Sequence, residues 1–140
     1  MKKVIFVCHG NICRSPAAEY IMKNLSKDFD VCSRATSYEE IGNDIYPPMK
    51  KELSRHGIKY DRHYATRMTR EDYESADYIF YMDDENQYNL YRMFGESSKI
   101  QPIYKYTPNI NEIEDPWYSD RFDLVFNQIY KCIQNIIKNI

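Results

Sequence analysis

The chain lacks any surplus of positive charge. Its 140 residues carry 19 lysines and arginines against 21 aspartates and glutamates, which gives a formal net charge of -2. Proteins that hold nucleic acids or membrane surfaces by general electrostatics need a basic stripe or patch. We therefore expect no nucleic-acid partner and no general attraction to a membrane surface.

Long apolar runs are absent as well. No window approaches the roughly 20 apolar residues that a membrane-spanning helix needs. The start of the chain, MKKVIFVC, carries two lysines, but its apolar run is short for a signal peptide and a polar loop follows it. We predict a cytoplasmic protein with no membrane span, while secretion by a route that needs no signal peptide stays open.

The cysteines and histidines show none of the spacings that are typical of metal sites. The four cysteines include no C-x-x-C pair, and the three histidines include no H-x-x-x-H pair. Without a signal peptide, the cysteines are expected to be reduced thiols rather than disulfides. We expect no metal ion and no other cofactor.

The order of the expected elements predicts the fold class. Internal repeats, low-complexity tracts and linkers are absent, and 140 residues suit one domain, residues 1–140. Strands that alternate with helices imply a parallel sheet covered on both faces. We predict a single-domain, three-layer α/β fold with a central parallel sheet of about four strands flanked by helices. Strands are expected at 3–8, 29–35, 77–83 and 99–104, with helices at 15–24, 48–57, 69–76, 84–95 and from 119 onward.

The first helix is expected to begin at a Ser-Pro pair. Ser15 has the residue type of an N-cap, Pro16 suits the first helical position, and Glu19 would lie in the first turn. The buried stripe of this helix is expected to include Leu25. Farther along, Thr69 is expected to cap a short helix with Asp72 reaching back to it.

The stretch VIFVCHGNICRSPAAEYI at 4–21 carries the strongest chemical signal. It places Cys8 at the carboxyl end of a strand and Arg14 at the entrance of a helix, with Gly10 between them for backbone freedom. Backbone N–H groups of such a loop, together with a helix N-terminus, form a cradle for a tetrahedral oxyanion. An arginine can bind two of its oxygens in a fork. A thiolate at Cys8 would lie in line to attack a bound phosphate and form a phosphocysteine.

A phosphoryl transfer of this kind needs a proton donor for the leaving group. The segment EDPW offers Asp115 near the end of the irregular stretch 105–118, followed by Trp117 and Tyr118. An Asp-Pro pair by itself is typical of a turn. Next to a thiolate that needs an acid, the catalytic interpretation is favoured, and the aromatic neighbours suit the wall of a slot for a phenyl phosphate.

These motifs resemble those of the low-molecular-weight protein tyrosine phosphatases. VIFVCHGNICRSPAAE is similar to the family's phosphate loop, V-C-x-G-N-I-C-R-S-P, placed after the first strand. Further matches follow in the same order along nearly the whole chain. They are SRATS at 33–37, IGN at 41–43, YIFYMD at 78–83 and DPWY at 115–118.

The resemblance implies a role for each matching residue. Cys8 would be the nucleophile, Arg14 the phosphate clamp, and Asp115 the acid and then the base. Ser15 would hydrogen-bond the Cys8 sulfur, and Asn11 would hold the loop in a strained shape. Ser33 and His63 would support that loop. The residues expected at the substrate are His9, Gly10, Asn11, Ile12, Cys13, Arg14, Ser15, Trp117 and Tyr118.

Several positions depart from the family's pattern, and two of them, His9 and Glu39, border the expected pocket. His9 stands where leucine, methionine or threonine is usual, which bears on substrate preference and pH dependence. Glu39 stands where many members carry an aromatic pocket wall, with Tyr38 one place early. One face of the slot is therefore expected to be open or acidic.

The resemblance implies a phosphatase that hydrolyses phosphotyrosine in proteins and releases inorganic phosphate. We also expect a monomer. A protein-arginine phosphatase on the same scaffold is the alternative, although that group usually carries threonine where Ile12 stands. An arsenate reductase would need relay cysteines within 83–95, which has none. A non-catalytic phosphate-binding module would be expected to lack Cys8, Arg14 or Asp115. Cys13 suggests redox regulation through a disulfide with Cys8, or else a small buried loop residue.

Overall fold

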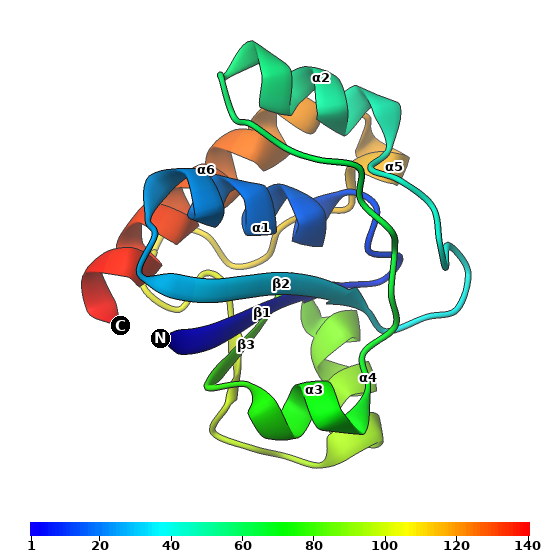
Figure 1. Ribbon diagram of the computed structural model, residues 1–140, viewed down its shortest axis with the longest axis vertical. Helices are drawn as coiled ribbons and strands as arrows, with labels where there is room; N and C mark the ends of the chain where they lie inside the picture. The colour runs from blue at the N-terminus through cyan, green and yellow to red at the C-terminus, as the bar shows by residue number, and fades with distance from the viewer.

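A computed structural model describes residues 1–140 (Figure 1). Strands and helices alternate through most of the chain. In chain order the elements are β1 (Lys2–Cys8), α1 (Arg14–Leu25), β2 (Phe29–Ala35), α2 (Pro47–Arg55), α3 (Arg70–Ser75), β3 (Tyr78–Tyr81), α4 (Asp84–Phe94), β4 (Ile100–Pro102), α5 (Pro116–Ser119) and α6 (Phe122–Asn139).

The four strands form one parallel sheet in the order β2-β1-β3-β4. β1 lies inside the sheet and pairs along its full length with β2, from Lys2 opposite Phe29 to Cys8 opposite Ala35. Because the chain moves to one side of β1 for β2 and to the other side for β3, the carboxyl end of β1 is the point where strand order reverses. Ligands of open α/β sheets bind at such points. This position is where the sequence places Cys8.

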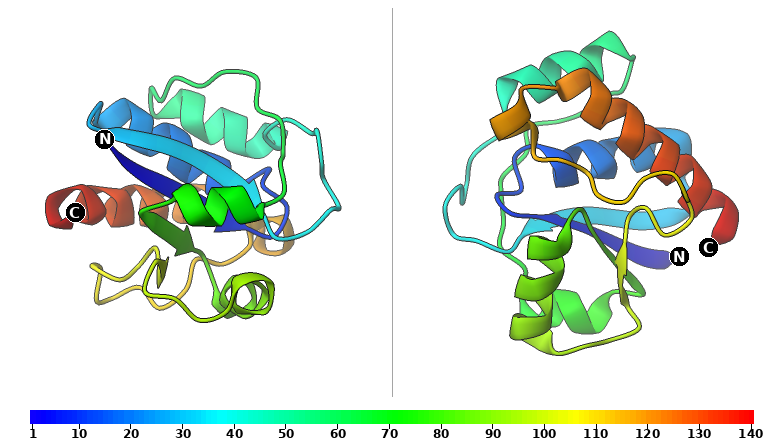
Figure 2. Two further views of the ribbon diagram at one scale, coloured as in Figure 1. Left: turned by 60° about the horizontal axis from the view of Figure 1, so that its bottom comes forward. Right: turned by 180° about the vertical axis from the view of Figure 1, so that it is seen from behind.

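Helices cover both faces of the sheet, which confirms the predicted three-layer fold (Figures 1 and 2). α1, α2 and α6 lie on one face, and α3 and α4 lie on the other. Alternate residues of β1 serve the two cores: Val4 and Phe6 belong to the larger cluster with α1 and α6, while Ile5 and Val7 belong to the smaller cluster with α4. All four side chains are fully buried, so the strand forms a continuous apolar run.

The last helix supplies much of the larger core. Its apolar residues recur at helical spacing on one face and are buried against α1 and α2. Each such side chain contributes about 1.5–3 kcal/mol on burial. The buried residues of α6 are Phe122, Val125, Phe126, Ile129, Cys132, Ile133 and Ile136.

None of the helices combines the length and apolarity needed to cross a membrane.

The predicted start of the first helix is wrong. α1 begins at Arg14, its N-cap is Cys13, and no side chain caps it. Ser15 already lies in the helix, and its hydroxyl contacts Cys8 Sγ at the end of β1 instead of capping the helix. Glu19 therefore lies beyond the first turn and is buried, whereas Leu25 is 38 % exposed rather than part of the buried stripe.

Two short helices show how well local capping signals predict helix starts: the cap of α3 was predicted, and α5 was not. The capping box predicted for α3 forms, with Thr69 Oγ1 accepting from the Asp72 amide at 3.0 Å and the Asp72 carboxylate accepting from the Thr69 amide at 3.0 Å. The one-turn helix α5 lies within a stretch expected to be irregular up to residue 118. Its cap is Asp115, whose Oδ1 accepts from the Trp117 amide at 3.0 Å.

Candidate active site

Three hydrogen-bond donors converge on the sulfur of Cys8. Cys8 is the last residue of β1 and only 3 % exposed. The backbone amides of Asn11 and Ser15 point to its Sγ at 3.3 and 3.4 Å, and Ser15 Oγ lies 3.0 Å from it. Ser15 Oγ accepts from Asn11 Nδ2 at 2.8 Å, and its own proton has two acceptors within reach, the Cys8 sulfur and the more distant Arg34 carbonyl at 3.5 Å. Donors arranged in this way stabilise a negative charge on the sulfur.

The tight path of the loop between β1 and α1 depends on Asn11. This residue is fully buried and adopts φ +58°, in the left-handed region that asparagine tolerates better than most residues. Its Oδ1 accepts from the Thr66 amide at 3.0 Å, and its Nδ2 donates to Ser15 and also to Ser33 Oγ at 3.0 Å. Its own carbonyl accepts from His63 Nε2 at 2.7 Å. These bonds hold the strained backbone in one shape.

A second layer of polar residues orients Ser33. Ser33 Oγ accepts from Asn11 and donates to Glu19 Oε1 at 2.6 Å, and Glu19 in turn pairs with Lys23 at 2.6 Å. Sequence reasoning treated Glu19 only as a helix-start signal. The missed clue is an acidic side chain on the buried face of a helix, which requires a partner inside the protein.

Position 10 needs a glycine for a different reason from the predicted backbone freedom. Left-handed backbone occurs at Asn11 rather than at Gly10. A Cβ at position 10 would lie 3.3 Å from Glu40 Cγ, closer than most such contacts. The glycine therefore lets the Glu40 side chain pass over the loop.

The Arg14 guanidinium is anchored beneath the loop. It is 3 % exposed, and its Nη1 donates to Asp83 Oδ2 at 2.7 Å and to the Ile113 carbonyl at 2.9 Å. Burial opposes its charge, but the negative charges of Cys8 and Asp83 outweigh that effect and raise the pKa of Arg14. Asp83 also caps α4 by accepting from the Asn86 amide at 2.9 Å. The sequence prediction gave Asp83 no role, although it follows β3 at the same edge of the sheet as Cys8.

Asp115 reaches the site from the far end of the chain. Its Oδ1 caps α5, which leaves Oδ2 at 3.6 Å from Arg14 Nη2. The preceding residue, Glu114, forms an ion pair with Arg121, and that hydrogen bond lowers the pKa of Glu114. The short helix and this pair fix the loop that presents Asp115.

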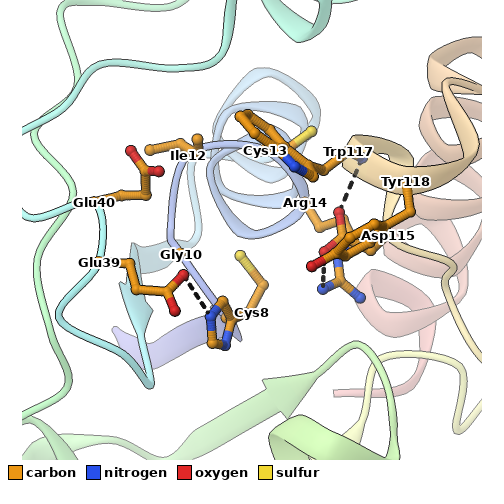
Figure 3. A pocket seen from close by; sticks show the side chains of 11 residues that line it. Cys8, Gly10, Ile12, Cys13, Arg14, Glu39, Glu40, Asp115, Trp117 and Tyr118 are labelled. Carbon is orange, nitrogen blue, oxygen red and sulfur yellow. Dashed lines mark hydrogen bonds and ion pairs between the residues drawn. The ribbon is translucent and has the colours of Figure 1, made fainter.

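A single pocket brings most of the predicted residues together. In Figure 3, Cys8 lies at the base between Asp115 on one side and Glu39 on the other. Trp117, 55 % exposed, packs on Tyr46 at 4.8 Å between ring centroids. The lining residues are Cys8, His9, Gly10, Ile12, Cys13, Arg14, Glu39, Glu40, Asp115, Trp117 and Tyr118.

Four predicted residues lie behind the pocket rather than in its lining. Asn11 and Ser15 are fully buried under the loop, where they contact Cys8 rather than the cavity. Ser33 and His63 hold Asn11 from below. The acidic face expected at Glu39 is present, and Glu40 adds to it.

A pH-dependent stability follows from the environment of His63. Its Nε2 bonds to a carbonyl, so the neutral ring carries its proton there, and burial lowers the pKa of His63. The unfolded chain therefore takes up the proton more readily than the folded chain. The free energy of unfolding should fall as the pH drops below about 6.5, the ordinary histidine value.

The measurement compares wild type with His63→Gln, whose amide can donate to the same carbonyl but does not titrate. Chemical denaturation at several pH values between 5 and 8 should show a decline at low pH that is steeper in wild type. Parallel pH profiles in the two proteins would contradict this role for His63.

Comparisons with known proteins place the chain among relatives of this architecture. Residues 3–140 match the family described as low molecular weight phosphotyrosine protein phosphatase. The chain is 37 % identical over 150 residues to the human protein of that name, covering 98 % of this chain and 94 % of the relative.

Solved structures agree with this match. A low molecular weight protein tyrosine phosphatase from Streptococcus pyogenes superposes with a TM-score of 0.92 at 36 % identity, covering 100 % of this chain and 93 % of that one. An arginine phosphatase from Geobacillus stearothermophilus shares the fold alone, with a TM-score of 0.89 at 20 % identity and coverage of 99 % and 92 %. The chain therefore belongs to the low molecular weight phosphotyrosine protein phosphatase family and is a protein tyrosine phosphatase, a phosphoric monoester hydrolase.

Proposed function

We propose that this protein hydrolyses phosphotyrosine in proteins through a phosphocysteine intermediate. The observation that carries the proposal is the convergence of three donors on Cys8 Sγ at the base of a pocket that also contains Arg14 and Asp115. A thiolate held in this way can attack a phosphorus atom in line, while the loop amides and the guanidinium bind the equatorial oxygens.

In the first step the Cys8 thiolate forms a bond to phosphorus as the bond from phosphorus to the phenolic oxygen breaks. Asp115, in its protonated form, gives its proton to the departing oxygen, and tyrosine leaves. Oδ2 suits this task because Oδ1 is occupied by the α5 cap, whereas Oδ2 accepts no hydrogen bond and lies 3.6 Å from Arg14 Nη2. Asp115 is then a carboxylate.

In the second step a water molecule replaces the phenol. Asp115 takes a proton from the water while the water oxygen forms a bond to phosphorus. The bond from phosphorus to the Cys8 sulfur breaks at the same time. Inorganic phosphate leaves, and the Cys8 thiolate regains its three donors, among them the Ser15 hydroxyl. The two steps return both residues to their starting protonation states.

The pocket walls favour an aryl phosphate over the alternative substrate, phosphoarginine. Trp117 and Tyr118 stand on one side of the opening, and Ile12 stands at the loop, so a phenyl ring has apolar surface to contact. The acidic face at Glu39 is the feature that keeps the protein-arginine phosphatase alternative open, because a guanidinium would be drawn to it.

A direct comparison of kcat/KM for phosphotyrosine and phosphoarginine tests the proposal. With EDTA present, we expect kcat/KM to be at least about ten-fold higher for phosphotyrosine, the scale on which pocket contacts discriminate. A preference for phosphoarginine would keep the mechanism and change the substrate. Hydrolysis that stops in EDTA and returns with a metal ion would overturn the metal-independent mechanism.

We further propose that Cys13 traps an oxidised Cys8. A peroxide would oxidise the Cys8 thiolate to a sulfenic acid, and the Cys13 thiol would then displace water from that sulfur to form a Cys8–Cys13 disulfide, which prevents irreversible over-oxidation. Cys13 lines the same pocket as Cys8, and all four cysteines are free thiols. Burial, together with the charge of Cys8, holds the pKa of Cys13 well above its usual value. Cys13 would therefore stay a protonated thiol until Cys8 is oxidised. The reduced thiols are consistent with the cytoplasmic location that we propose. Because residues of one chain complete the pocket, we also propose that the protein acts as a monomer.

A further inference from the structure

Carboxylates gather at the mouth of the candidate active site. Glu39 and Glu40 line the pocket, and Glu85 at the start of α4 stands next to them across His9. We name these three glutamates the acid rim. The positions of Glu39 and Glu40 opposite Trp117 and Tyr118 place them where the chain on either side of a bound phosphotyrosine would pass (Figure 3).

The acid rim is held in place rather than left loose. His9 Nε2 forms a hydrogen bond with Glu39 Oε2 at 2.9 Å, whereas His9 Nδ1 has no hydrogen-bond partner and lies 3.6 Å from Glu85 Oε1, so the imidazole stands between the two glutamates. Glu40 accepts from Asn43 Nδ2 at 2.7 Å while its stem crosses Gly10. These contacts fix acidic groups around His9, directly after the nucleophile in sequence.

No lysine or arginine neutralises the acid rim. Other acidic groups near the site have such partners, as Asp83 has Arg14, Glu19 has Lys23 and Glu114 has Arg121. Glu39 and Glu85 pair only with His9, and their side chains are 68 % and 69 % exposed. Glu40 forms no ion pair with any residue of the chain.

Carboxylates at the entrance oppose the binding of a phosphate dianion by like-charge repulsion. A substrate that brings its own positive charge removes this opposition and gains an attraction. An acidic flank, by contrast, would add to the repulsion. The arrangement therefore discriminates between phosphotyrosine sites by the charge of their neighbours.

We propose that the acid rim reads the residues beside the phosphotyrosine and favours lysine or arginine within one or two positions of it. This inference rests on the proposed function and deepens it by naming a class of substrate. Each exposed ion pair between a glutamate of the acid rim and a basic residue of the peptide should lower Kd a few-fold. The Kd values of peptides with basic and with acidic flanks should therefore differ by about ten-fold at low ionic strength. The difference should shrink in high salt, where the Debye length is short.

Two phosphotyrosine peptides of equal length test the proposal, one flanked by arginines and the other by glutamates. Affinity is measured as Kd with Cys8→Ser protein, and turnover as kcat/KM with Cys8 present. The rim variant is Glu39→Gln/Glu40→Gln. The matched control is Glu74→Gln/Glu96→Gln, which removes two exposed charges beside the starts of β3 and β4, at the opposite end of the sheet.

The expected ratio of Kd values is about ten in favour of the arginine peptide, falling to about two in the rim variant and unchanged in the control. Equal affinities, equal ratios in the two variants, or no binding of either peptide would overturn the proposal. If the arginine peptide binds more tightly but neither peptide is hydrolysed, the acid rim stands and the proposed catalysis fails. If both peptides are hydrolysed and bound equally, the catalysis stands and the rim fails.

Discussion

Serine in place of Cys8 should lower kcat for p-nitrophenyl phosphate by about 10,000-fold or more, the scale seen when a catalytic nucleophile is removed. The introduced hydroxyl would lie among the same donors, but it would stay protonated because no base lies against it: the Asn11 and Ser15 amides both donate to this position. Steady-state release of p-nitrophenol measures the loss.

The matched control for this change is Cys32→Ser. Cys32 is a free, half-buried thiol on β2, outside the pocket lining. Its substitution should change kcat less than about two-fold, and melting temperatures should show that both variants are folded. Activity that survives Cys8→Ser would remove the thiolate from the mechanism, whereas equal losses in both variants would point to a general sensitivity of the fold.

Asparagine in place of Asp115 should lower kcat for phosphotyrosine by about 100- to 1,000-fold, the range of general acid-base catalysis. The substitution keeps an oxygen that can accept from the Trp117 amide, so α5 retains its cap. It removes only the proton that the leaving tyrosine needs. A substrate whose leaving group is a more acidic phenol, such as p-nitrophenyl phosphate, should lose less.

Asp120→Asn is the matched control, because Asp120 is exposed beside α5 and adopts φ +60°, a conformation that asparagine accepts. This variant should keep wild-type kcat on both substrates. A loss in Asp115→Asn that is the same for good and poor leaving groups would argue for a role in binding or loop position instead of proton donation.

The sequence predicted the fold well where periodicity is strong. The apolar run of β1 and the helical spacing of Phe122, Val125 and Ile129 in α6 correspond to buried faces in the structure. The start of α1 was misplaced because a Ser-Pro pair carries the same signal whether the serine caps a helix or bonds elsewhere. In the structure the Ser15 hydroxyl lies 3.0 Å from Cys8 Sγ, as the family resemblance implied and the helix-start pattern alone did not.

The parts of the candidate site that escaped prediction depend on contacts between distant segments. Asp83 meets Arg14 across 69 residues, and Glu19 meets Ser33 only because α1 packs on β2. No local pattern encodes such pairs. The acidic face was expected from Glu39 alone, whereas the approach of Glu85 to His9 requires the start of α4 to lie beside the loop that follows β1.

The central claim is that phosphate passes through a covalent bond to Cys8. Rapid acid quenching of the enzyme during turnover of p-nitrophenyl phosphate, followed by mass spectrometry of the peptide that contains Cys8, tests it most directly. The mechanism predicts one phosphate on Cys8, formed with a burst of p-nitrophenol close to one equivalent of enzyme. Full turnover with no phosphate on Cys8 and no burst would contradict it and would indicate direct attack by water.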